Sequence, residues 1–233
     1  MTPQAAYAPT AIGSAERVTA FLRKVYGWMC VGLGVTAAVA FGVAGSPTLL
    51  QAIFGNKILF FGLMIAELGL VFYLSARVNK LAPATASGLF LLYSALNGAT
   101  LAMIFVAFTG TSIATTFLVT AGMFGALALY GTTTKRSLAG VGQFVFMGLI
   151  GVILASLVGM FVHSAALQFV ISVVGVIVFT GLTAWDAQRL KAMAVAVPDG
   201  RVGSYAVVGA LSLYLDFINL FLFMLRFMGG RRD

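Results

Sequence analysis

The chain has 233 residues, of which 61% are hydrophobic and only 9% are charged. An ordinary soluble domain carries about 25% charged residues, so this composition excludes a soluble globular protein and favours lipid-embedded helices. One spanning helix needs about 20 apolar residues. With short loops, the length therefore allows about seven such helices and no sizeable extramembrane domain. A single Cys and a single His exclude an internal disulfide, a thiolate zinc site and any mechanism that needs two imidazoles.

Seven apolar blocks follow one another along the chain. A polar stretch over 1–22 predicts a flexible cytoplasmic tail, which is followed by a membrane domain over 23–229 and a short basic tail over 230–233. The first block resembles a signal peptide with a cleavage site at Ala38–Ala40, but six more apolar blocks favour an uncleaved first helix. We therefore predict an all-α membrane protein with helices over 25–45, 54–75, 84–107, 113–131, 141–162, 166–189 and 205–228.

Basic residues are distributed unevenly between the loops. Ten lie on the N-terminal side or in the even-numbered loops: Arg17, Arg23, Lys24, Arg77, Lys80, Lys135, Arg136, Arg189, Lys191 and Arg201. The odd-numbered loops hold only Lys57, so the positive-inside rule places the N-terminus in the cytoplasm. We read the net charge of +8 in the same way, and expect no binding to nucleic acid. The multi-pass chain is expected in the inner membrane.

The C-terminal arginines break this pattern. Arg226, Arg231 and Arg232 follow the seventh block. Either the last segment spans the bilayer against the rule, or it re-enters and returns to the same side. Its length favours spanning.

Three acidic residues, Glu67, Asp186 and Asp216, lie inside apolar blocks. Ionisable groups within the hydrocarbon are costly and normally face the interior of a helix bundle. Asp216 is near the middle of the seventh block, and Asn219 is three residues further on, so both lie on one helix face. A single polar stripe on an otherwise apolar helix predicts that the seventh helix is central in the bundle.

Asp186 and Asp216 are the candidate functional pair. If they meet in a dry interior, both cannot ionise cheaply, so they share one proton and titrate as a unit. Such a pair senses pH, and its deprotonated oxygens are suitable ligands for a hard cation such as calcium. Two alternatives stay open: Asp186 is a wetted helix-end carboxylate near Arg189, and Asp216 is a protonated acid that only hydrogen-bonds a neighbouring helix.

Further polar residues are candidates for supporting roles. Glu67, together with Asn219, lies on a candidate ion path, or else Glu67 is a neutral acid that is bonded within the bundle. Arg77 is either a loop residue that only helps to set the orientation of the chain in the membrane, or the counter-ion of the aspartate pair.

Several of these stretches also carry a resemblance to a known family. The stretches are 24–29, 114–136, 181–186 and 209–221, and the last two contain the two aspartates. Through them the chain resembles the Bax inhibitor-1 family of membrane proteins, in its bacterial YccA-like branch. The resemblance implies seven helices with the last at the centre of the other six. It also implies a cytoplasm-side pH sensor at Asp186 and Asp216, an engaging arginine near Arg77, and a pH-sensitive calcium leak. The sixth loop, 190–204, looks longer than in members with a well-described sensor.

Three classes of function were compared. The leading hypothesis is a pH-gated calcium leak whose ligands are protons and calcium. The alternative is a non-transporting stress protein that modulates a membrane protease or another membrane partner. An intramembrane aspartyl protease also needs two facing aspartates, but the usual Gly-x-Gly-Asp is absent because Leu213, Tyr214 and Leu215 precede Asp216. We therefore expect no enzymatic activity and no cofactor.

Overall fold

The computed structural model describes residues 11–162, 164–230 and 232, with the side chains of 11–14 left aside. Its elements are, in chain order, α1 (Ala11–Ala44), α2 (Pro47–Phe54), α3 (Lys57–Arg77), α4 (Pro83–Leu101), α5 (Met103–Ala107), α6 (Gly110–Thr133), α7 (Ala139–Gly159), α8 (Ala165–Ala196), the 3₁₀ helix η1 (Asp199–Arg201) and α9 (Val202–Met228). Within this described part, seven helical segments are long and apolar enough to cross a membrane. The predicted all-α, seven-span architecture is confirmed.

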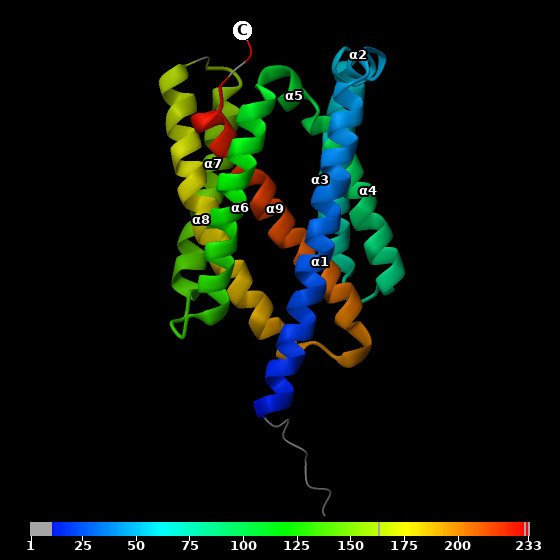
Figure 1. The fold of residues 1–233 in the computed structure, drawn as a ribbon, viewed down its shortest axis with the longest axis vertical. Coiled ribbons are helices and arrows are strands. Elements are labelled where there is room, and N and C mark those ends of the chain that lie inside the picture. The colour runs from blue at the N-terminus through cyan, green and yellow to red at the C-terminus, as the bar shows by residue number, and fades with distance from the viewer. Residues whose placement is uncertain (1–10, 163, 231, 233) are drawn as a thin grey trace, which may run out of the picture.

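The spans are α1, α3, α4 with α5, α6, α7, α8 and α9 (Figure 1). The short α2 belongs to the first loop. It begins at Pro47, which lacks a backbone N–H, but at the first position of a helix that group has no partner within the helix. The Ser46 hydroxyl caps the helix by accepting a hydrogen bond from the Leu49 N–H. The third span is interrupted at Ala102, where α4 ends and α5 begins.

Two helices extend further beyond their apolar blocks than the sequence predicted. Residues 11–22, which we expected in a flexible tail, are helical, because no proline occurs between Pro9 and Pro47 to stop α1. Likewise α8 continues to Ala196 and ends just before Pro198. The prediction of a long sixth loop over 190–204 is therefore wrong, because only residues 197–201, which include η1, connect α8 to α9. Residues 1–10, 231 and 233 of the two predicted tails, and the lone His163, lie outside the described residues.

Helix α9 is the most buried of the seven spans. Of its most apolar window 67% is buried, against 6–33% for the other six spans. It packs most extensively on α8 and α1, then on α6, α4 and α3. That α9 is surrounded by all six other spans stays a prediction.

The last span crosses the bundle completely. It begins beside the start of α1, and it ends at the turn between α5 and α6 (Figure 1). There the Thr109 N–H donates to the Gly230 carbonyl at 3.2 Å, and the Arg232 N–H donates to the Ala107 carbonyl at 3.1 Å. A re-entrant last segment is therefore ruled out, and Arg226 and Arg232 lie at the end of the bundle opposite to the start of α1.

Glycines allow α6 and α7 to approach α8 closely. A Cβ at Gly131 would lie 2.1 Å from the Ala184 carbonyl oxygen, and a Cβ at Gly142 would lie 2.4 Å from the Trp185 ring. Real Cβ atoms almost never come that close to other atoms, so each position requires glycine. These two contacts fix the part of α8 that immediately precedes Asp186.

Candidate functional site

Asp186 and Asp216 are both buried in the bundle, with 8% and 6% of their surface exposed. At 1.5 Å per residue, Asp186 lies about 15 Å along α8 from Ala196, and Asp216 lies about 21 Å along α9 from Val202. The two helices are joined by a short connection and pack along each other. The predicted boundary of α8 at residue 189 would have left Asp186 near the membrane interface. With α8 extended to Ala196, the two aspartates lie at comparable distances along their helices from the connection.

Asp186 and Asp216 are carried by α8 and α9, the two helices that pack most extensively on each other. Arg189 Nη1 lies 3.6 Å from Asp186 Oδ1, and its guanidinium lies 5.3 Å from the centre of the Trp185 ring. Asp216 Oδ2 is buried and has no hydrogen-bond partner among the described residues. An unpartnered carboxyl oxygen beside a second acid can accept a proton or a cation.

Neither Arg77 nor Asn219 makes a hydrogen bond or an ion pair with these two aspartates among the described residues. Arg77 ends α3 as an exposed side chain, and the ion pairs of the described residues do not include it. Arg189 occupies the counter-ion role that we considered for Arg77. Asn219 is half-buried, and its amide donates to the Leu215 carbonyl of its own helix at 2.8 Å.

Glu67 belongs to a separate polar network that links four helices. Its carboxyl group accepts hydrogen bonds from Asn97 Nδ2 at 3.1 Å and from Thr100 Oγ1 at 2.9 Å. Asn97 Oδ1 accepts from the Tyr214 hydroxyl at 2.9 Å, and that hydroxyl lies 2.6 Å from Thr36 Oγ1. The network therefore connects α3, α4, α9 and α1. Sequence reasoning missed Asn97, although an amide inside an apolar block was a usable signal.

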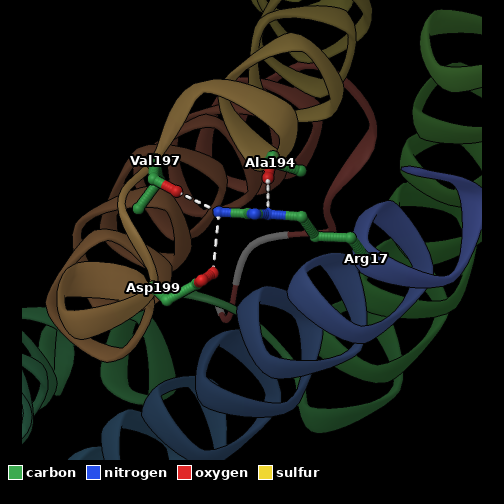
Figure 2. Close-up of polar contacts among 4 residues, drawn as sticks. All are labelled: Arg17, Ala194, Val197 and Asp199. Atoms are coloured by element: carbon green, nitrogen blue, oxygen red, sulfur yellow. Dashed lines mark hydrogen bonds and ion pairs between the residues drawn. The ribbon is translucent and has the colours of Figure 1, made fainter. Parts of the chain in front are cut away.

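A basic side chain holds the connection between the two aspartate helices. Arg17, on the N-terminal part of α1, donates to the carbonyl oxygens of Ala194, at 3.1 Å, and Val197 (Figure 2). It also pairs with Asp199 at 3.1 Å. Carbonyls at the end of a helix have no partner within that helix, so the guanidinium caps α8. From the sequence, Arg17 was interpreted only as one of the basic residues that set the orientation of the chain in the membrane.

The acidic pair does not fit a resident calcium site. Within the described part of the chain, no group of three or more His, Cys, Asp and Glu residues is arranged to hold a metal ion. Calcium prefers roughly six to eight oxygen ligands, more than two carboxylates supply. A cation would also compete with Arg189 for Asp186. Calcium is therefore considered below only as a transported ion.

The fold and the site define a class: a multi-pass helical membrane protein whose acidic pair is buried between its last two spans. The sequence family described as "Inhibitor of apoptosis-promoting Bax1" matches residues 18–233. The chain therefore belongs to the Bax inhibitor-1 family, as its motifs predicted.

The chain is also similar to individual proteins over most of its length. The chain is 51% identical to inner membrane protein YbhL of Escherichia coli (strain K12), with 91% of this chain and 92% of the relative covered. It is 46% identical to an uncharacterized protein of Borreliella burgdorferi, with 91% and 93% covered. It is 40% identical to an uncharacterized protein of Rickettsia prowazekii, with 94% and 92% covered. Together with the seven apolar helices, the first relative supports a multi-pass protein of the inner membrane.

Proposed function

We propose that this protein is a pH-sensitive cation leak, with calcium as the expected ion, and that the proton occupancy of Asp186 and Asp216 gates it. One observation carries the proposal. Asp216 is buried within the bundle, its Oδ2 has no hydrogen-bond partner among the described residues, and a second buried acid, Asp186, lies on the adjoining helix α8. A fully charged pair in this environment is unfavourable, so a proton or a cation stabilises it.

The gating element is the packing of α9 on α8. When one of the two carboxyls is protonated, the repulsion between two full negative charges is absent. When the proton leaves, two negative charges repel across the interface between α8 and α9, and among the described residues Arg189 forms its ion pair with Asp186. The two protonation states therefore favour different positions of α9, which is the element with contacts to most of the bundle.

We further propose that the N-terminus and the connection between α8 and α9 are cytoplasmic. The uneven distribution of basic residues supports this orientation. In this orientation the sensor is reached by protons from the cytoplasm, through the end of the bundle where Arg17 binds the connection.

Calcium flux into proteoliposomes, measured between pH 5 and pH 8, tests the proposal. The wild-type protein should conduct with a clear pH dependence, and Asp216→Asn should remove that dependence because one titrating partner is lost. Asp199→Asn is the matched control, because Asp199 is an acid whose side chain is 90% exposed at the cytoplasmic-side end. The control should keep the wild-type pH profile.

Two results would count against the leak. Equal flux at every pH in the wild type and in Asp216→Asn would remove the sensor. No flux at any pH, with a membrane protease retained on the purified protein, would instead favour the non-transporting stress modulator.

A further inference from the structure

Two adjoining cavities lie at the end of the bundle that carries the C-terminus. The first has a volume of about 470 Å³ and lies between α7 and α9, and the second has a volume of about 840 Å³ and lies among the ends of α5, α8 and α9. Both are lined by Gly159, Gln168 and Arg226. Gln168 Nε2 donates to the Gly159 carbonyl at 3.3 Å, so this hydrogen bond lies at the junction of the two cavities.

The second cavity is basic. Arg226 and Arg232 both line it. Arg232 is held in place, because its N–H donates to the Ala107 carbonyl at 3.1 Å and its Nη1 donates to the Phe105 carbonyl at 2.9 Å. The Arg226 guanidinium lies 5.9 Å from the Phe223 ring. In the described part of the chain, neither arginine has an acidic partner. Two guanidinium groups around one cavity are suited to a phosphate, which they bind through paired N–H donors.

The first cavity is apolar and reaches the lipid-facing surface. Leu149, Val152 and Leu222 line it, and so does Ile153, which is 51% exposed. It extends from Arg226 to Asn219, which is seven residues or about 10 Å along α9. A helix surface that is exposed within the spans faces hydrocarbon, so this cavity is suited to an acyl chain.

We propose that the two cavities together bind one anionic phospholipid. Its phosphate lies between Arg226 and Arg232, and one acyl chain follows α7 and α9 toward Asn219. The basic cavity would accept a free phosphate equally well, but the adjoining apolar cavity favours a phosphate that carries a hydrocarbon chain. A zwitterionic lipid contributes no net charge to the two arginines and therefore binds less well. The site also gives a role to the arginines that stand at the end of the bundle opposite to most basic residues.

Native mass spectrometry of the delipidated full-length protein tests this site. Dioleoyl phosphatidylglycerol and dioleoyl phosphatidylcholine are added at equal concentrations, with inorganic phosphate as a competitor. The wild type should bind phosphatidylglycerol at least about tenfold more tightly, and Arg226→Gln and Arg232→Gln should each weaken that binding about tenfold. Lys57→Gln is the control: Lys57 is a basic residue at the same end of the bundle, outside both cavities, and its loss should change nothing.

A groove variant separates a lipid from a free anion. Ile153→Trp fills the apolar cavity and should reduce binding of phosphatidylglycerol, and inorganic phosphate should fail to displace the lipid from the wild type. Three results would overturn the proposal: equal binding of the two lipids to the wild type, unchanged preference in the arginine variants, or full displacement by phosphate together with unchanged lipid binding in Ile153→Trp. Arg232 follows the last helix, so Arg232→Gln still gives an answer if Arg226→Gln does not fold.

Discussion

Replacing Gly131 by alanine should destabilise the bundle next to the acidic pair. The added Cβ would lie 2.1 Å from the carbonyl oxygen of Ala184, 2.9 Å from its carbonyl carbon and 3.1 Å from its Cα. All three are backbone atoms of α8, so no side-chain rotation relieves the clash. An ordinary contact begins at 3.4 Å, so α6 and α8 must separate locally by about 1.3 Å, two residues before Asp186.

The expected cost follows from two opposing terms. Overpacking of a close interface costs about 1–3 kcal/mol, and a rigid backbone contact belongs at the upper end of that range. Alanine is favoured over glycine within a helix by about 1 kcal/mol, which offsets part of that cost. We therefore expect Gly131→Ala to lower the free energy of unfolding by about 1–2 kcal/mol.

The assay is reversible unfolding in mixed detergent micelles, followed by circular dichroism. Gly125→Ala is the matched control, because Gly125 lies on the same helix and a Cβ there would meet nothing within 4 Å. This variant should be neutral or slightly stabilising, so the two variants should differ by about 1–3 kcal/mol. If Gly131→Ala is as stable as Gly125→Ala, the close approach of α6 and α8 is wrong. The displacement of α8 should also change the pH profile of the proposed leak.

Three further predictions concern polar contacts. Tyr214→Phe removes the hydroxyl that donates to Asn97, and should cost about 1 kcal/mol in the same unfolding assay, since buried hydrogen bonds between membrane helices are worth about that much. Arg17→Ala removes the cap of α8 and should cost about 1–2 kcal/mol and speed proteolysis of the connection between α8 and α9. Arg189→Gln removes the cation that stabilises the charged form of Asp186, so the protonated form persists to higher pH and the midpoint of calcium flux should move upward.

Each of these has a control or a contradicting result. Tyr205→Phe removes an exposed hydroxyl that donates to Asn79, and should cost less than the Tyr214 change. Asp199→Asn removes only the exposed partner of Arg17, so a loss equal to that of Arg17→Ala would mean that the carbonyl contacts contribute nothing. A flux midpoint that moves downward in Arg189→Gln would show that this arginine does not stabilise the charged pair.

The spans could be predicted because hydrocarbon imposes one strong requirement on the sequence. A block such as 84–107 must be apolar along its whole length, and the structure places α4 and α5 over 83–107. Helix ends outside the hydrocarbon obey no such requirement. The extensions of α1 to Ala11 and α8 to Ala196 contain charged residues, so an apolar window misses them, although the positions of the prolines indicated where helices could continue.

The burial of the two aspartates could be predicted from the sequence, and their partners less so. A carboxylate within an apolar block is costly unless it faces the bundle interior, and the structure buries both Asp186 and Asp216. The proximity of Asp186 to Arg189 was one of the alternatives that the sequence left open, because the two residues are three positions apart on one helix. The contacts of Arg17 join residues about 180 positions apart, and no local pattern encodes such a pairing.

The contact between Arg232 and Ala107 has a practical consequence for labelling. It fixes the last described residue at the end of the bundle opposite to the first turns of α1, so reporters fused to the two termini would lie in different compartments. A fluorescent protein that matures only in the cytoplasm would then be bright on one terminus and dark on the other. A bright N-terminus would place the start of α1, and with it the connection between α8 and α9, on the cytoplasmic side of the membrane.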